Sequence, residues 1–249
     1  MIFAVSFKYR KSNIMTDQKT ALITGASKGL GFALAERLAR EGWKLLIDAR
    51  NARQLLAAKN KLSDLTEVIA ISGDVRDEIH LLQLAEALEK NGWTLDVVVN
   101  NASVLGGSPL PRLLDHPVED LHVVFHTNLI APISLLQKVR PFLQPGAVVI
   151  NVSSDAGAEA YETWGAYGGS KAGLDHVTAV LAKENPAFRF YAFDPGDMRT
   201  DMHQDAFPGE DISDRPLPGE FAVPAILEII RNPLPGGRYT TQLLKQPQL

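Results

Sequence analysis

The sequence predicts an α/β fold in which helices flank a mainly parallel sheet. From Thr20 onward, short apolar runs alternate with amphipathic segments, a pattern typical of repeated strand–helix units. The run Leu95–Asn100 contains three consecutive valines, as expected for a strand buried on both faces. A glycine-rich turn at residues 24–31 separates the first apolar run from the first amphipathic segment. No break in composition divides residues 20–249, so we expect a single domain there.

The apolar runs and the amphipathic segments place the elements along the chain. Strands are expected at residues 21–24, 44–48, 67–72, 95–100, 147–152, 188–193 and 238–240. Helices are expected at residues 29–41, 52–62, 78–90, 117–142, 165–184 and 221–231. Pro132 lies inside the longest of these helices and should kink or locally open it, because proline removes one backbone hydrogen bond. Residues 195–219 are interspersed with glycines, prolines and charges, and we expect a mobile loop there.

The composition excludes several classes of protein. The net charge of −4 argues against non-specific nucleic-acid binding, which requires a clustered basic surface. No apolar run approaches the ~18 residues of a membrane-spanning helix. The chain has no cysteine, which excludes disulfides and thiolate metal sites and fits a cytoplasmic location; no other metal-ligand cluster is evident. Residues 1–19 are expected to be a flexible extension, part of which precedes the true start if that start is Met15.

Three side chains have the spacing of an acid–base site: Ser154, Tyr167 and Lys171. Residues four apart share one face of a helix, so Tyr167 and Lys171 should point into one site. A phenol has a pKa near ~10, and an adjacent ammonium lowers that pKa because it favours the phenolate. A serine hydroxyl beside the phenol could hold a carbonyl oxygen. This constellation could protonate or deprotonate an oxygen atom while a hydride is transferred.

The glycine-rich turn offers a place for a hydride donor. Gly25, Gly29 and Gly31 lie between the first strand and the first helix. Glycines let the backbone approach a pyrophosphate, and a helix N-terminus presents unpaired N–H groups and the positive end of the helix dipole. The alternative is a tight turn that binds no ligand. The position directly after the first strand favours dinucleotide binding.

Together these motifs resemble those of the short-chain dehydrogenase/reductase family. The matching positions, in chain order, are residues 24–31, Asn100-Asn101-Ala102, Asn128, Ser154, Tyr167, Lys171 and Pro195-Gly196. The resemblance covers about residues 20–241. It implies a single Rossmann-type domain with a seven-stranded sheet. It also implies hydride transfer between a nicotinamide cofactor and a carbonyl or alcohol carbon.

The resemblance further implies roles for individual residues. Tyr167 would be the general acid or base, Lys171 would hold the nicotinamide ribose and lower the pKa of the tyrosine, and Ser154 would hydrogen-bond the substrate oxygen. Asn128 would anchor a water that relays protons to the lysine; alternatively it only distorts its helix. The spacing from the tyrosine selects Ser154 over Ser153, which is expected to be structural.

The cofactor is expected to contact residues that follow the strands. Asp74 would face the adenine amino group, although a helix N-cap is an equally good interpretation. Ser103 stands where the family usually has glycine, and it would be strained if that position needs a positive φ. The expected cofactor contacts are Gly25, Ser27, Lys28, Gly29, Leu30, Gly31, Arg50, Asp74, Val75, Asn101, Ala102, Tyr167, Lys171, Pro195, Gly196 and Thr200.

The end of the second strand favours NADPH over NADH. An acidic side chain there would bind a ribose 2′-hydroxyl and repel a 2′-phosphate. By the family's spacing that position is Ala49, and Asp48, one residue earlier, should point to the other side of the strand. Arg50 stands where a cation commonly binds the 2′-phosphate, and Lys28 in the glycine-rich turn adds a second cation.

The leading hypothesis is an NADPH-dependent ketone or aldehyde reductase. Val104, Leu105, Tyr161 and Trp164 are expected to line the pocket and indicate a partly apolar or aromatic carbonyl substrate. The chain lacks a glycine-rich stretch after its last strand, so a homodimer is expected instead of a tetramer. Its interface is expected at the helices predicted over residues 117–142 and 165–184. The alternative hypothesis is a non-catalytic NADP(H)-sensing regulator on the same fold.

Overall fold

The computed structural model describes residues 18–245, which form one seven-stranded sheet flanked by helices. The strands lie in the order β3-β2-β1-β4-β5-β6-β7, and every neighbouring pair is parallel. Their bounds are β1 Thr20–Ile23, β2 Lys44–Ala49, β3 Val68–Ser72, β4 Leu95–Asn100, β5 Leu143–Val152, β6 Arg189–Asp194 and β7 Gly237–Thr240. The predicted α/β class and the Rossmann-type sheet are confirmed. Most of the predicted extension, residues 1–19, lies outside the described residues.

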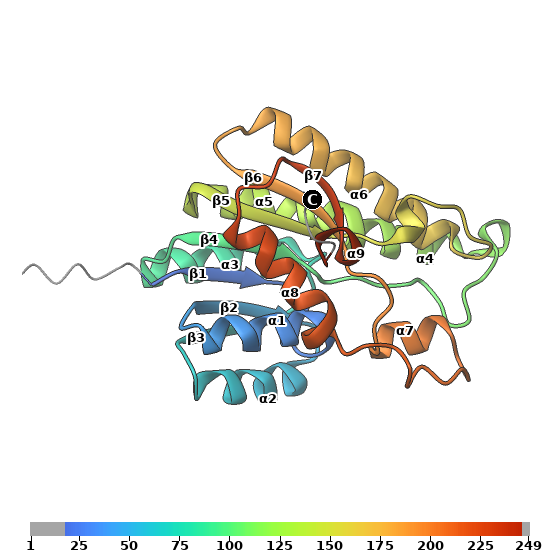
Figure 1. The fold of residues 1–249 in the computed structure, drawn as a ribbon, viewed down its shortest axis with the longest axis horizontal. Coiled ribbons are helices and arrows are strands. Elements are labelled where there is room, and N and C mark those ends of the chain that lie inside the picture. The colour runs from blue at the N-terminus through green and yellow to red at the C-terminus, as the bar shows by residue number, and fades with distance from the viewer. Residues whose placement is uncertain (1–17, 246–249) are drawn as a thin grey trace, which may run out of the picture.

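Helices cover both faces of the sheet (Figure 1). Their bounds are α1 Gly29–Arg40, α2 Ala52–Ser63, α3 Glu78–Asn91, α4 Val118–Phe125, α5 Ala131–Val139, α6 Gly165–Glu184, α7 Asp201–Ala206, α8 Pro218–Arg231 and α9 Thr241–Lys245. The apolar faces of α1, α2 and α8 form a core with one face of the sheet. Those of α3, α5 and α6 pack on the other face.

Alternate side chains of the central strands enter these two cores. On β1, Ala21 and Ile23 pack with α1 and α8, whereas Leu22 packs with α3 and α5. On β4, Val98 and Val99 likewise enter opposite cores. A parallel sheet that is covered on both faces therefore needs continuous apolar strands, which is why the valine run predicted β4.

The carboxyl ends of the strands form the edge of the sheet that holds the site. The glycine-rich turn follows β1, Asn101 follows β4, Ser154 follows β5 and Pro195 follows β6. α7 lies beyond the same edge (Figure 1). In open parallel sheets, ligands bind at this edge.

α7 lies inside the segment 195–219, where the sequence predicted a loop without a helix. Thr200 is its N-cap, and its Oγ1 accepts a hydrogen bond from the His203 N–H at 3.2 Å. A threonine followed by an acidic residue, Asp201, is a helix-start signal that the surrounding glycines and prolines obscure. α8 begins at Pro218, earlier than predicted, because a missing N–H is tolerated in the first turn of a helix.

The single helix predicted over residues 117–142 is divided into parts. α4 is followed by a π-helical turn, His126–Ile130, then by α5 and by a 3₁₀ turn, Arg140–Phe142. In a continuous α-helix the N–H of residue 132 would donate to the carbonyl of Asn128. Pro132 has no N–H, and the backbone widens into the π turn directly before it. The predicted local opening of the helix is confirmed.

Asn128 is held in the π turn by four side-chain hydrogen bonds. Its Oδ1 accepts from the Val104 N–H at 2.9 Å and from Ser103 Oγ at 3.0 Å. Its Nδ2 donates to the Val104 carbonyl at 2.9 Å and to Ser170 Oγ at 3.0 Å. These bonds use the whole hydrogen-bonding capacity of the amide. The buried side chain therefore joins the loop after β4 to α6 and has no capacity left for a water.

Replacing Asn128 with alanine should destabilise the protein strongly. Asn128→Ala leaves buried donors and acceptors of the loop after β4 without partners, so the free energy of unfolding should fall by about 2–4 kcal/mol. Chemical denaturation followed by circular dichroism measures this loss. The control is Asn91→Ala, because Asn91 makes one exposed hydrogen bond at the end of α3. An equal decrease in the free energy of unfolding in the two variants would show that the buried Asn128 hydrogen bonds stabilise the protein no more than an exposed one does.

Candidate active site

A cleft of about 820 Å³ lies at the carboxyl edge of the sheet, a volume typical of cofactor and ligand sites. It brings together most of the predicted site residues: Gly25, Ser27, Lys28, Gly29, Leu30, Arg50, Asp74, Val75, Asn101, Ala102, Ser154, Tyr167, Lys171, Pro195, Gly196 and Thr200. Two predicted site residues, Gly31 and Asn128, do not line the cleft and lie behind its wall.

The glycine-rich turn forms one wall of the cleft. Gly25 and Gly29 have φ angles of 65° and 59°, in the left-handed region that favours glycine. Gly31 leaves room for its neighbours, because a Cβ there would lie 2.6 Å from Asn101 Nδ2. That nitrogen donates to the Thr24 carbonyl at 2.8 Å and ties the turn to the end of β4. Gly31 therefore supports the turn from behind.

Tyr167 and Lys171 lie one turn apart on α6 and both line the cleft, as their spacing predicted. α6 approaches the loop after β5 so closely that a Cβ on Gly168 would lie 2.4 Å from the Ala156 carbonyl oxygen. Tyr167 is 8% exposed and Lys171 is 2% exposed. Lys171 Nζ donates to the Val152 carbonyl at 2.7 Å, which holds the ammonium at the end of β5.

The expected lowering of the Tyr167 pKa is wrong for this structure. Burial raises the pKa of Tyr167 to about 12, although the Ser154 and Ser103 hydroxyls pull it down. The nearby carboxylates of Asp194 and Asp155 raise it further. The Lys171 ammonium lies 5.4 Å from the centre of the phenol ring and bonds to a carbonyl instead. Desolvation therefore outweighs the attraction between phenolate and ammonium, and the phenol is protonated at neutral pH.

Burial also shifts the pKa of Lys171, but it lowers this pKa. It lowers the pKa of Lys171 to about 8, because removal from water penalises the charged form. The Asp175 carboxylate favours the ammonium and partly opposes this effect. At neutral pH the cleft therefore contains a neutral phenol beside a lysine that is close to its titration point.

Ser154 lies at the end of β5, where its backbone starts a short 3₁₀ turn. Its Oγ donates to Asp155 Oδ1 at 2.9 Å and accepts from the Ala156 N–H at 3.2 Å. Asp155 also lines the cleft and was not predicted as a site residue. An exposed acid beside a serine gives no sequence signal that separates it from any surface carboxylate.

The end of β2 contributes Asp48, Ala49 and Arg50 to the cleft. Arg50 is exposed. Asp48 is fully buried, and its Oδ1 accepts a hydrogen bond from the Gly25 N–H at 2.8 Å. The Asp48 side chain meets His80 of α3, whereas Ala49 packs in the core with α1 and α2, so the two point to opposite sides of the strand, as predicted.

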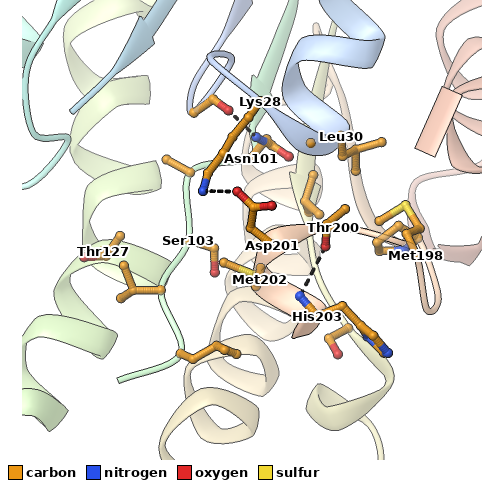
Figure 2. Close-up of a pocket in the computed structure, with 18 of the residues that line it drawn as sticks. Lys28, Leu30, Asn101, Ser103, Thr127, Met198, Thr200, Asp201, Met202 and His203 are labelled. Carbon is orange, nitrogen blue, oxygen red and sulfur yellow. Dashed lines mark hydrogen bonds and ion pairs between the residues drawn. The ribbon is translucent and has the colours of Figure 1, made fainter. Parts of the chain in front are cut away.

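Lys28 lies across the cleft from α7 and pairs with an acid there. Figure 2 shows its side chain extending from the glycine-rich turn to Asp201, with Nζ 2.6 Å from Asp201 Oδ2. Both side chains are exposed, so the pair contributes little to stability. Thr200 lies beside this bridge at the start of α7 (Figure 2). The predicted second cation for a 2′-phosphate is thus engaged by a carboxylate in this structure.

Asp74 lines the cleft beyond β3 and is not a helix cap. The Arg76 guanidinium donates to both oxygens of Asp74 and holds the pKa of that carboxyl below its usual range. The N-cap of α3 is Asp77, whose side chain accepts from the Ile79 N–H at 2.9 Å. The capping interpretation of Asp74 is therefore wrong.

The strain that was expected at Ser103 is absent. Within residues 18–245, Thr163 is the only non-glycine residue with a positive φ. Ser103 donates its hydroxyl to Asn128 Oδ1 at 3.0 Å. The serine thus adds a hydrogen bond to the loop after β4 without requiring a glycine-like backbone.

An apolar surface lies beside the Tyr167 phenol. Val104, Leu105 and Trp164 line the cleft as predicted, and the indole packs edge to face on the phenol ring, with the ring centres 5.7 Å apart. Met202 of α7 completes this surface and was missed because α7 was not predicted. Tyr161 was predicted to line the pocket but is exposed outside the cleft.

Similarity to known proteins agrees with this geometry. The family model described as short chain dehydrogenase matches residues 19–211. A chain from Pseudomonas syringae, described as a putative short chain dehydrogenase, superposes with a TM-score of 0.84 at 27% identity, covering 90% of this chain and 94% of that one. A Shigella flexneri structure, described as a putative short chain dehydrogenase complexed with NADP, gives the same TM-score and identity, covering 90% of this chain and 97% of that one. Across residues 18–245, no helix is long and apolar enough to cross a membrane.

Curated relatives carry enzymatic names. The NADPH-dependent pterin aldehyde reductase of Arabidopsis thaliana is 28% identical over 88% of this chain and 90% of its own length. A 3-oxoacyl-[acyl-carrier-protein] reductase of rhamnolipid biosynthesis from Pseudomonas aeruginosa is 35% identical over 67% of this chain and 66% of its own length. The chain therefore belongs to the short chain dehydrogenase family and is an NAD(P)-dependent oxidoreductase that acts on carbonyl or alcohol groups.

Proposed function

We propose that this protein is an NADPH-dependent reductase of ketones or aldehydes in which Tyr167 is the general acid. The observation that carries the proposal is the buried phenol in the cleft, whose pKa of about 12 keeps its proton at neutral pH. Reduction of a carbonyl creates an alkoxide, which is a far stronger base than a phenolate. A protonated tyrosine can therefore donate to that oxygen without a lowered pKa. The opposite direction, alcohol oxidation, would require the phenolate that burial disfavours.

The residues around the phenol support this role. Bound NADPH would supply the hydride. Tyr167 and Ser154 would both donate to the carbonyl oxygen, which requires the Ser154 proton to turn away from Asp155. The Lys171 ammonium, held on the Val152 carbonyl, would favour the phenolate that remains after proton transfer.

The relay role of Asn128 is proposed in a changed form. Its side chain makes four hydrogen bonds within the protein, so it is not available to a water. In a continuous α-helix, its main-chain carbonyl would accept a hydrogen bond from the N–H of residue 132. That residue is Pro132, which has no N–H to donate. We place the water of the relay on that carbonyl.

The residues present fit a dinucleotide that carries a 2′-phosphate. Gly29 faces open cleft, where a Cβ would meet only a Thr200 methyl group at 3.8 Å, so the turn can be approached closely. Arg50 lines the cleft beside Ala49, and the buried Asp48 carboxylate that also borders the cleft is already engaged by the Gly25 N–H and by His80. The NADPH-dependent Arabidopsis relative and the Shigella flexneri structure with NADP support the same preference.

The substrate side favours a flat carbonyl compound with apolar or aromatic character. Leu105, Trp164 and Met202 form the surface beside the phenol. The Arabidopsis relative is named for a pterin aldehyde, which is a flat aromatic compound. Aromatic and heteroaromatic aldehydes are therefore the first probes to assay.

The alternative, a non-catalytic NADP(H)-sensing regulator, has less support. The cleft keeps all three groups of the acid–base site, and the relatives described above are named as enzymes. A homodimer through α4–α5 and α6, and a cytoplasmic location, stay predictions.

Tyr167→Phe should abolish reduction while leaving the cofactor bound. Removal of the phenolic proton should lower kcat by at least about 10²-fold, the usual contribution of general acid catalysis. The loss of NADPH absorbance with a panel of aromatic aldehydes measures kcat, and NADPH fluorescence measures binding. Tyr239→Phe is the matched control, because Tyr239 lies outside the cleft, its hydroxyl donates to the Pro235 carbonyl, and the variant should behave as wild type. Full activity of Tyr167→Phe would exclude Tyr167 as the acid.

Arg50→Ala should reduce the preference for NADPH over NADH. Loss of a charge-assisted contact to the 2′-phosphate should lower the ratio of the two kcat/KM values by about tenfold or more, mainly through the KM for NADPH. The assay uses both cofactors at a fixed aldehyde concentration. Arg53→Ala is the control, because Arg53 is an exposed arginine of α2 that does not line the cleft. An unchanged ratio in Arg50→Ala would refute the role of Arg50.

A further inference from the structure

We propose that His80 and Asp48 form a buried positioning pair that holds the glycine-rich turn and thereby sets the affinity for the dinucleotide. The inference rests on the proposed cofactor function of the cleft, since it concerns the backbone that would receive the dinucleotide. The pair consists of one side chain from α3 and one from β2, and neither was predicted from the sequence to support the turn.

Asp48 makes the contacts that fix the start of the turn. Its Oδ1 accepts from the Gly25 N–H at 2.8 Å, and its main-chain carbonyl accepts from the Ala26 N–H at 2.9 Å. Gly25 is also packed against the end of β4, since a Cβ there would lie 3.0 Å from the Ala102 Cα. A displacement of the Asp48 carboxylate would therefore change the position of the first backbone segment that faces the cleft.

His80 is the second partner of this carboxylate. The His80 ring is 3% exposed, and its Nε2 lies 2.9 Å from Asp48 Oδ2. The other ring nitrogen, Nδ1, is buried without a hydrogen-bond partner in the described part of the chain. The ring packs directly over Gly73, where a Cβ would lie 2.2 Å from Nδ1. The absence of a side chain at Gly73 is what makes room for the imidazole.

These contacts indicate which atoms of His80 and Asp48 share a proton. A doubly protonated imidazole would leave a charged Nδ1–H buried without an acceptor, which is strongly unfavourable. The geometry instead fits one proton between Nε2 and Oδ2, with Nδ1 bare against Gly73. Burial raises the pKa of the Asp48 carboxyl, and the hydrogen bonds from His80 and Gly25 oppose that effect. Without the imidazole, the carboxylate would lose one of its two partners inside the protein.

The position of the pair separates binding from chemistry. Asp48 lies at the end of β2, and three strand spacings across the sheet, roughly 14 Å, separate β2 from β5 at the catalytic serine. Loss of His80 should therefore loosen the turn at the adenosine end of the cleft and leave Tyr167, Lys171 and Ser154 in place. Affinity should change and the rate at saturating cofactor should not.

The test compares His80→Leu with His80→Gln in the full-length protein. The leucine variant removes the donor, whereas the glutamine variant can present its amide nitrogen close to the position of Nε2. NADPH fluorescence measures Kd, and aldehyde reduction at saturating NADPH measures kcat. His80→Leu should raise Kd by about tenfold with kcat within about twofold, and His80→Gln should restore most of the affinity.

A buried histidine elsewhere controls for general loss of packing. His116 is 7% exposed, and neither of its ring nitrogens has a hydrogen-bond partner among residues 18–245. His116→Leu should leave the Kd for NADPH unchanged. An unchanged Kd in His80→Leu, or an equal rise in His116→Leu, would overturn the proposal. A Kd for NADPH that is as high in His80→Gln as in His80→Leu would also overturn it.

Two further experiments distinguish failure of this proposal from misfolding of a variant and from an error in the proposed cofactor. If His80→Leu is insoluble, His80→Ala is titrated with and without added imidazole, which should tighten NADPH binding; no effect of imidazole would overturn the proposal. All titrations are repeated with NADH. A wild-type protein that binds NADH and not NADPH would refute the proposed cofactor preference, and the same variants read on NADH would still test the His80–Asp48 pair.

Discussion

Burial of Tyr167 and Lys171 against the end of β5 is the constraint on which the rest of the site depends. The close approach of Gly168 to the Ala156 carbonyl brings α6 against the loop after β5 and removes both side chains from water. Desolvation then keeps the phenol protonated and brings the lysine near its titration point. The same packing thus determines both where the Tyr167 phenol lies and that it keeps its proton at neutral pH.

The groups that position the cleft are buried or half-buried polar side chains whose hydrogen bonds join the segments around it. Asn128 joins the loop after β4 to α6, and Asn101 ties the glycine-rich turn to β4. Asp48, backed by His80, holds the same turn from β2. Each of these side chains connects segments that are far apart in the chain and adjacent at one edge of the sheet. The cleft is lined by glycines, hydroxyl groups and charged side chains together with apolar side chains.

Much of the fold could be predicted because its signals are local. The buried strands are continuous apolar runs, and the four-residue spacing of Tyr167 and Lys171 requires only a helix to bring them together. The protonation states could not be predicted. The sequence spacing of Tyr167 and Lys171 does not show how far each side chain is removed from water in the folded protein. The pairing of Lys28 with Asp201 could not be predicted, because Asp201 is remote in sequence and lies on a helix hidden in a glycine- and proline-rich segment. The Asp48–His80 pair was missed for the same reason, since only the packing of α3 over Gly73 brings the two together.

The pKa of Tyr167 in the protein without NADPH is the most direct measurement of whether burial controls the site. Ultraviolet difference absorbance, or NMR of ring-labelled tyrosine, gives this value when Tyr167→Phe is used to assign the signal. We predict that the phenol titrates well above the ordinary tyrosine value of ~10, at about 12. A pKa at or below ~10 would contradict this, because the Lys171 ammonium would then outweigh desolvation.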